Sequence, residues 1–317
     1  MKIGRFIKEW ILIIVMVVGV SVYLAYHNIP SLHQAGPFLY RSCTFIQPIL
    51  LFCMLFLAFC KVEPKDFKLR GWHFKILAFQ CLSFIALALL LLIFPAIPAR
   101  MAIMALMLCF ICPTGTSTPV VVNKLGGDIP EVVSYTVLIN VAVAVLVPIF
   151  LPLVYPKEGL TFIQSFWRIM MKVFPLLVLP CVCAWLVRYR APRLHSWFLK
   201  YVDASFYIWA ASLMIAIIIS TRALVISGNS LLILLEMSAA SLISCFVQFA
   251  LGRKIGSGCG RSLTARQALG QKNTSFGIWL GYTFFDPVVS VAYGFYCIWQ
   301  NSYNTWQLRH PEKCRES

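Results

Sequence analysis

The sequence contains little charge. Only 12% of its 317 residues are charged, and Asp and Glu together number 11, whereas 60% of the residues are hydrophobic. A typical soluble domain is about 25% charged and about 45–50% apolar. Almost no stretch long enough for a soluble core lies outside the hydrophobic runs. This excludes a chain of soluble domains and indicates an integral membrane protein, so the net charge of +16 does not indicate nucleic-acid binding.

Histidine is missing from the middle of the apolar runs. All five histidines lie at or outside the run ends, which excludes heme ligation and histidine acid–base chemistry inside the membrane. The twelve cysteines lie mostly within the runs, where cysteine acts as a small apolar residue. Catalysis needs a nucleophile–base set or a metal cluster. We therefore expect no enzyme, no resident cofactor and no metal centre held by these residues.

Apolar runs of about 20 residues predict membrane-spanning helices. We count ten, and the predicted fold is an all-α integral membrane protein with a single domain over 1–317. Five runs in each half imply two inverted repeats, approximately 1–158 and 159–310, as in many secondary transporters. The predicted spans are 10–26, 40–60, 74–94, 101–122, 131–153, 164–187, 203–220, 227–251, 263–283 and 287–306.

The basic residues are unevenly distributed between the two sets of loops. Of the 27 Lys and Arg residues, 20 lie in loops on the N-terminal side and six on the opposite side. The remaining one is Lys272, inside the ninth run. Because Lys and Arg collect in cytoplasmic loops, both termini are predicted to be cytoplasmic, in a plasma or inner membrane.

Two of the apolar runs are interrupted by glycine, proline and small polar residues. The fourth contains "CPTGTSTPV", beginning at Cys112, and the ninth contains "ALGQKNTSFG", beginning at Ala268. Non-helical backbone at membrane depth is tolerated where it lines a cavity, and paired interruptions in the two halves point to a binding site. The resumed half-helices begin with free N–H groups and partial positive charge, which predicts a niche for an anion.

The loop "GGDIPEVV" predicts the start of the fifth span. We expect Asp128 to be its N-cap and Glu131, three residues later, to close a capping box.

These two interrupted motifs resemble those of the bile acid:sodium symporter family, in its bacterial type. The tenth-span segment "IWQNSYN" is similar to a further motif of that family. The resemblance implies a core domain with crossed fourth and ninth helices and a panel domain, which move against each other for alternating access to organic anions. Thr116, Asn273 and Asn301 match the family's substrate-binding positions. We include their neighbours Ser117, Thr274 and Gln300 in the predicted substrate site.

The family's sodium positions are only partly matched. Thr118 and Thr136 stand at hydroxyl positions of the first Na⁺ site, and Gln80 at a glutamine position of the second. Pro119 and Val132 replace side chains with oxygen ligands, and Ala268 replaces the shared glutamate. Lys272, after Gln271, replaces the ninth-span glutamine. An ammonium group offers no lone pair to a cation, so we expect weakened or absent Na⁺ coupling.

A lysine in the middle of a membrane span is costly and generally functional. We hypothesise that the Lys272 ammonium occupies the volume of the second Na⁺ as a tethered cation. Glu236, about ten residues into the eighth span, is expected at a similar depth, where a Glu236–Lys272 pair is sterically possible. Such a pair would be either a fixed bridge or a proton-coupling device.

The leading hypothesis is a secondary transporter of an organic anion such as a bile acid, keto acid or hydroxy acid. Its expected partners are that small anion and the lipid bilayer, with no nucleic acid and an undetermined oligomeric state. A non-transporting membrane sensor on the same fold and a proton-coupled transporter are the alternatives.

Overall fold

The computed structural model describes residues 2–201, 204–228 and 231–310. Apart from one isolated bridge, these residues form helices and connecting loops. The bounds of the α-helices are α1 Lys2–Asn28, α2 Gly36–Cys60, α3 Gly71–Ile93, α4 Arg100–Ile111, α5 Thr118–Leu125, α6 Ile129–Val154, α7 Phe162–Arg190, α8 Pro192–Lys200, α9 Ala204–Ser227, α10 Leu231–Ser257, α11 Ser262–Gly270, α12 Thr274–Phe284 and α13 Ser290–Arg309. Three short 3-10 helices, η1 Pro30–Ala35, η2 Pro64–Asp66 and η3 Pro287–Val289, lie between them.

Each predicted span contains a helix or a pair of half-helices. Within the described ranges, six helices are long and apolar enough to cross a membrane, and they correspond to α2, α3, α6, α7, α9 and α10. The other four predicted spans correspond to α1, to the interrupted pairs α4/α5 and α11/α12, and to α13. The number of ten spans therefore remains a prediction, because two of these are divided and two do not meet the same criterion.

The helices pack in two groups that share an extensive contact. In the first group α10 packs against α4, α11 and α13, and α3 packs against α4 and α6. In the second, α9 packs against α1 and α2, and α2 packs against α7. Contacts of α6 with α7 and of α12 with α9 join the two groups. The interrupted helices therefore belong to the first group, and α12 is the one that packs against the second group, through α9 and α2.

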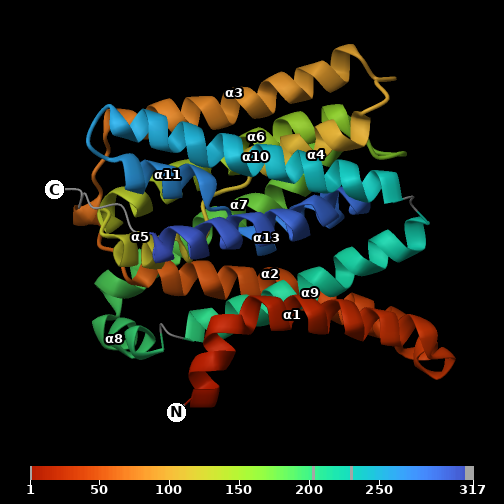
Figure 1. Cartoon of the computed structure of the whole chain (residues 1–317), viewed down its shortest axis with the longest axis horizontal. Helices are drawn as coiled ribbons and strands as arrows, with labels where there is room; N and C mark the ends of the chain where they lie inside the picture. Colours follow the sequence, from red (N-terminus) through yellow and green to blue (C-terminus); the bar gives the residue numbers. More distant parts are fainter. Residues whose placement is uncertain (1, 202–203, 229–230, 311–317) are drawn as a thin grey trace.

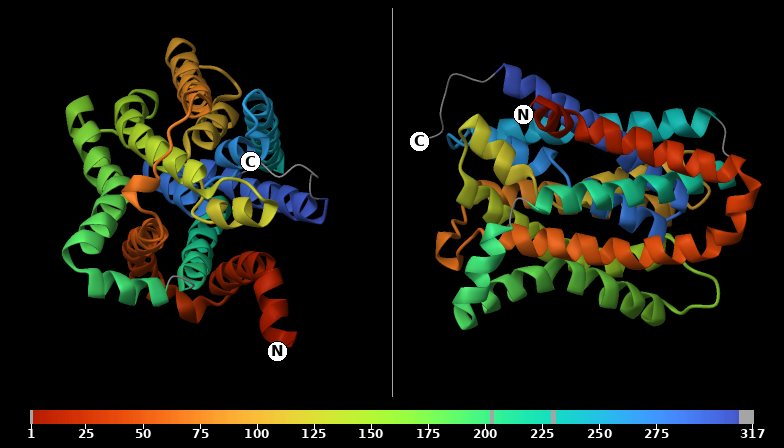
Figure 2. Two further views of the ribbon diagram at one scale, coloured as in Figure 1. Left: turned by 90° about the vertical axis from the view of Figure 1, so that its left-hand side faces the viewer. Right: turned by 90° about the horizontal axis from the view of Figure 1, so that it is seen from below.

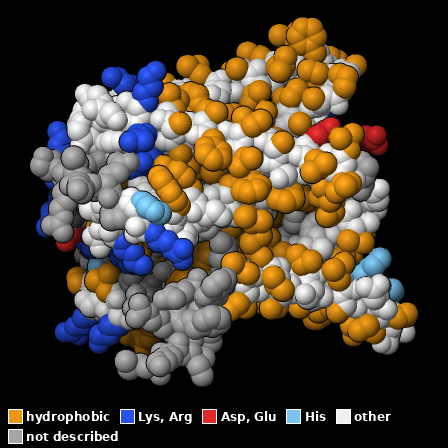
Figure 3. All heavy atoms as spheres, in the orientation of Figure 1, with side chains coloured by type: hydrophobic (Ala, Val, Ile, Leu, Met, Phe, Trp, Pro, Cys, Tyr) orange, Lys and Arg blue, Asp and Glu red, His pale blue; other side chains and the backbone are white. Residues whose placement is uncertain are grey.

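Charge and apolar surface are separated along the length of the molecule. The beginning of α1 and the end of α13 lie at the same end (Figures 1 and 2). Lys and Arg side chains gather at this end, whereas hydrophobic side chains cover the middle (Figure 3). This is the arrangement expected of a protein whose middle lies in lipid and whose basic end lies in water.

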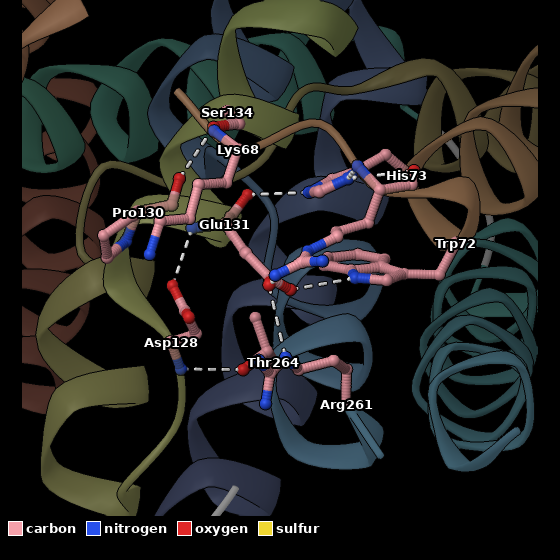
Figure 4. A network of polar contacts seen from close by, with 10 residues as sticks. Lys68, Trp72, His73, Asp128, Pro130, Glu131, Ser134, Arg261 and Thr264 are labelled. Atoms are coloured by element: carbon pink, nitrogen blue, oxygen red, sulfur yellow. Dashed lines mark hydrogen bonds and ion pairs between the residues drawn. The ribbon is translucent and has the colours of Figure 1, made fainter. Parts of the chain in front are cut away.

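A buried carboxylate ties three helices together at the basic end (Figure 4). The Glu131 side chain, fully buried at the start of α6, accepts hydrogen bonds from Trp72 Nε1 at 3.0 Å and Arg261 Nε at 3.2 Å. Arg70 Nε lies 3.1 Å from the same carboxylate. Because Arg70 and Trp72 lie at the start of α3 and Arg261 precedes α11, Glu131 holds the starts of α3, α6 and α11 in register.

This network corrects the predicted capping box. Asp128 is the N-cap of α6, since its Oδ1 accepts from Glu131 N at 2.9 Å. The Glu131 side chain does not return to the Asp128 backbone, however. The Asp128 N–H donates instead to Thr264 Oγ1 at 2.9 Å, on α11 (Figure 4). A tertiary contact has taken the place of the local one because α11 lies beside the beginning of α6.

Candidate functional site

The two interruptions meet and pair through their backbones. Gly115 N donates to Gln271 O at 2.9 Å, and Asn273 N donates to Pro113 O at 2.9 Å. Thr114 and Lys272 thereby form an isolated antiparallel bridge. Backbone groups that leave a helix inside a membrane need partners. Each interruption supplies them to the other, and the result is a crossing of α4/α5 with α11/α12.

Gly115 is required by the closeness of this crossing. A Cβ atom at this position would lie 2.9 Å from the Lys272 carbonyl oxygen and 3.2 Å from its carbonyl carbon. Both atoms belong to backbone that is held by the bridge and therefore has little freedom to move. Any side chain larger than hydrogen would push the two segments apart.

Side chains from neighbouring helices bind the carbonyls at the ends of the first half-helices. Gln80 Nε2 on α3 donates to Cys112 O at 2.8 Å, at the end of α4. Tyr296 OH on α13 donates to Gly270 O at 2.8 Å, at the end of α11. Helix ends leave such carbonyls without partners inside the helix, and these contacts satisfy them without water.

Lys272 lies at the centre of the crossing. The residue is only 2% exposed, and its Nζ has no hydrogen-bond partner among the described residues. Its backbone is fixed by Gln300, whose Oε1 accepts from Lys272 N at 2.8 Å.

The structure does not form the Glu236–Lys272 pair. Helix α10 begins at Leu231, so Glu236 lies in its second turn and is half-buried, rather than ten residues deep. The predicted depth was wrong because the eighth span was taken to begin at residue 227, which the structure assigns to the end of α9. With Lys272 Nζ unpartnered within the described chain, the two side chains form no ion pair in this structure.

All six predicted substrate residues line one small pocket beside the crossing. Its volume is about 10 Å³, which is room for little more than a water molecule. We call it the crossing pocket. Its lining consists of Gly115, Thr116, Ser117, Trp209, Lys272, Asn273, Thr274, Gln300 and Asn301.

The polar groups around the crossing pocket differ in their availability. Asn273 caps α12, with its Oδ1 accepting from Phe276 N at 3.2 Å, while its buried Nδ2 has no partner within the described chain. The Ser117 hydroxyl accepts from Gln271 Nε2 at 2.8 Å. Asn301 Nδ2 donates to Cys297 O of its own helix at 2.7 Å. Asn273 Nδ2 thus has both of its N–H groups available to a ligand.

The predicted ion-site residues differ in whether their polar atoms have hydrogen-bond partners. Gln80 Oε1 accepts from Tyr135 OH at 2.7 Å, and its amide nitrogen is used at the end of α4. Thr136 Oγ1 donates to Val132 O in its own helix at 2.9 Å. Thr118 Oγ1 is buried without a partner in the described part of the chain, as is Gln271 Oε1. Two unpartnered side-chain oxygens therefore remain near the crossing.

Sequence reasoning missed Trp209 and Gln248. Trp209 reaches the crossing pocket from α9, the second helix group, and nothing distinguishes it in sequence from the other aromatic residues of that span. Gln248 Nε2 on α10 donates to Cys109 O at 3.3 Å and to Tyr296 OH at 3.2 Å. A glutamine inside an apolar run is a visible signal, and it could have been identified as a support of the crossing.

Comparison with known proteins agrees with the geometry of this site. A search of curated proteins gives no match. The family model described as Sodium Bile acid symporter family matches residues 48–229, more than half of the chain, and this range contains the α4/α5 interruption. The crossing of two interrupted helices and the matched region lead to one conclusion: the chain belongs to the sodium bile acid symporter family, a family of multi-pass membrane transporters.

Proposed function

We propose that the protein moves an organic anion across the membrane by alternating access, with the Lys272 ammonium acting as a tethered cation. The observation that carries the proposal is the position of Lys272, which is buried at the helix crossing with an unpartnered Nζ in the described chain. A buried charge without a partner costs stability and is kept where function requires it.

An anion is the ligand that the crossing pocket favours. Helices α5 and α12 both begin beside it, at Thr118 and Thr274, and helix N-termini carry partial positive charge and free N–H groups. The Asn273 Nδ2 adds a buried donor. In an opened pocket a carboxylate or sulfonate would accept hydrogen bonds from these groups, whereas a cation would meet two unfavourable dipoles and an ammonium.

The side chains present do not fit two Na⁺ sites. A hard cation needs about six oxygen ligands, whereas the predicted ion-site residues supply four side-chain oxygens, from Gln80, Thr118, Thr136 and Gln271. Pro119 and Ala268 have no side-chain oxygen, and Lys272 places an ammonium among these positions. Four side-chain oxygens are too few for two such ions.

Alternating access is supported by the division of the helices into two groups. The crossing pocket takes Trp209 from α9 and its other residues from the first group. Movement of the second group past the crossing would expose the pocket to one side and then to the other. We propose inverted repeats at approximately 1–158 and 159–310, and cytoplasmic termini in a plasma or inner membrane, in keeping with the basic end of the molecule (Figure 3).

Uptake into proteoliposomes tests this function. A panel of bile acids, keto acids and hydroxy acids is first screened by thermal shift, and the best ligand is then used for uptake with Na⁺ or K⁺ outside. We expect equal uptake in the two salts. Lys272→Gln should lose uptake or become responsive to the cation, whereas Lys254→Gln, which removes an exposed lysine at the end of α10, should not. Strict Na⁺ dependence of the wild type would refute the tethered cation.

A further inference from the structure

A second and much larger cavity lies at the end of the molecule opposite the N-terminus. Its volume is about 1090 Å³, and we call it the outer pocket. Ligand pockets for molecules of drug size occupy about 300–1,000 Å³, so this cavity is large enough for an organic ligand. It is lined by the first half of α2, by α7, by the loop between α6 and α7, and by the end of α12, through Phe38, Tyr40, Arg41, Ser42, Thr44, Phe45, Pro48, Ile49, Lys157, Lys172, Trp279, Tyr282 and Thr283.

The charged residues that line the outer pocket are all positive. Arg41, Lys157 and Lys172 come from three different segments, and within the described ranges none of them forms an ion pair with a carboxylate. Lys157 Nζ donates to Thr283 O at 3.2 Å, and Lys172 Nζ lies 5.8 Å from the centre of the Phe284 ring. These contacts orient the cations but leave their charge uncompensated.

The acidic residues near this end do not contribute to the lining. Glu158, which follows Lys157 in the loop, and Asp286, which caps η3, are absent from it. Partial burial, Lys172 and Arg168 lower the pKa of Lys157 below its ordinary value. A positive charge in this loop is thus disfavoured by its neighbours, and an anion placed among them would relieve that repulsion.

Aromatic side chains form the inner part of the same pocket. Trp279 is 3% exposed and Tyr282 is 9% exposed, both on α12. The Tyr282 hydroxyl is buried and makes no hydrogen bond of good geometry within the described chain, although the Thr283 side chain lies beside it. A buried hydroxyl without a partner is costly, so this group is a donor available to a polar ligand. Aromatic walls below a cationic rim suit a molecule with an apolar body and an acidic group.

We propose that the outer pocket is a separate binding site for an amphipathic organic anion, whose acidic group meets Arg41, Lys157 and Lys172 while its apolar body lies against Trp279 and Tyr282. Such an anion can be a soluble organic acid or the headgroup of an anionic lipid. The outer pocket would bind such an anion whether or not the protein transports it. Only its use as an entry site for transport rests on the proposed function.

Helix α12 connects the outer pocket with the crossing pocket. Its first residue, Thr274, lines the crossing pocket, and Tyr282 near its last turn lines the outer pocket. Eleven residues of helix span about 16 Å. The two pockets therefore lie at opposite ends of one short helix, and each has a lysine in its lining.

Binding of dansyl-taurine, a sulfonate attached to an aromatic ring system, tests the site. The protein is reconstituted in phosphatidylcholine nanodiscs, and binding is followed by energy transfer from tryptophan to dansyl, with empty nanodiscs as background. We expect the triple variant Arg41→Gln, Lys157→Gln, Lys172→Gln to bind about tenfold more weakly. The matched control Lys200→Gln with Lys254→Gln removes exposed lysines at the opposite end and should bind as the wild type does.

The three substituted side chains are exposed, so the triple variant should fold. If it does not, the single Arg41→Gln and Lys172→Gln variants each carry the test, with about twofold weaker binding expected. Unchanged affinity in these variants overturns the proposal. A second arm adds phosphatidylglycerol to the nanodiscs. Competition that the triple variant abolishes identifies a lipid headgroup as an occupant, and absence of competition identifies a soluble anion.

Uptake measurements separate the two proposals. If the wild type moves no anion but dansyl-taurine binding depends on the three cations, the proposed function fails and the outer pocket stands. If uptake depends on Lys272 while the affinity for dansyl-taurine is unchanged in the triple variant, the binding site in the outer pocket is refuted and the proposed function is supported.

Discussion

Thr114 and Lys272 form an antiparallel backbone bridge at the point where the two interrupted helices cross. On either side of it, Gly115 pairs with Gln271 and Asn273 pairs with Pro113. The bridge satisfies backbone groups that lipid cannot, and it fixes the Lys272 side chain at one depth. The stability of the crossing and the position of the buried cation are therefore coupled.

Substitution of Gly115 should open this crossing. In Gly115→Ala the new Cβ would lie 2.9 Å from the Lys272 carbonyl oxygen. We expect a loss of about 1–3 kcal/mol in the free energy of unfolding, from overpacking against backbone, and loss of uptake. Thermal melting in detergent checks the first and proteoliposome uptake the second. Gly71→Ala, where no atom lies within 4 Å of the new Cβ, is the matched control. An unchanged melting temperature in Gly115→Ala would contradict the close crossing.

Replacement of Lys272 should separate stability from function. Lys272→Met removes an unpartnered buried ammonium and keeps a chain of similar length. Because such a charge is costly to bury, we expect a higher melting temperature together with loss of uptake. Lys124→Met, at an exposed site on α5, should change neither property much. A marked fall in melting temperature for Lys272→Met would mean that the ammonium is a structural group.

Gln80 and Tyr135 should act as one unit. Gln80→Leu leaves the Cys112 carbonyl at the end of α4 without its donor, and Tyr135→Phe leaves Gln80 Oε1 without its own. Each buried unsatisfied group costs about 1–3 kcal/mol. A double-mutant cycle on thermal or denaturant unfolding should therefore give a smaller loss in the double variant than the sum of the single losses. Additive losses would show that the two side chains act independently.

Glu131→Gln should weaken the basic end of the first helix group. The substitution removes the buried negative charge that Arg70 and Arg261 share. Removal of one partner from a buried ion pair costs about 3–5 kcal/mol, and the exposure of Arg70 places the expected loss at the lower end of that range. Glu158→Gln, at an exposed loop position, should change stability by about 0.5 kcal/mol or less. Equal melting temperatures in the two variants would contradict the role of Glu131.

Anion binding in the outer pocket should weaken as pH rises. Lys157 must be charged to attract the sulfonate, and burial, Lys172 and Arg168 lower its pKa below the ordinary value of 10.5. Deprotonation therefore begins at a lower pH than for a free lysine, and affinity for dansyl-taurine should begin to fall in that range. Lys157→Gln should bind more weakly than the wild type at neutral pH and lose this part of the pH dependence. A pH profile identical to that of the wild type would exclude Lys157 from the site.

The sequence predicted the helices well because their signals are local. Apolar runs of spanning length, and glycine and proline inside two of them, indicated both the helical class and the two interruptions that now form the crossing. The six substrate-site residues were predicted from motifs around these interruptions, and they line one pocket. Trp209 could not be predicted, because its contact with the pocket depends on how α9 packs against α12.

The sequence alone was misleading where a residue had a choice of partners. Glu131 had the spacing of a capping box, but Trp72 and Arg261 are better partners for a carboxylate that is buried between three helices. The depth of Glu236 was predicted from an eighth span that begins at residue 227. Helix α10 begins at Leu231 instead, so Glu236 lies nearer to the start of its helix than predicted.

By itself, the sequence determined that the chain forms membrane helices, that two of them are interrupted, and that one interruption contains a lysine, because hydrophobic length and backbone preferences act over a few residues. Only the tertiary structure decided that no carboxylate of the described residues pairs with Lys272 and that three cations share a cavity with Trp279 and Tyr282. These relationships join residues from distant segments, and their distances are set by how the two helix groups pack.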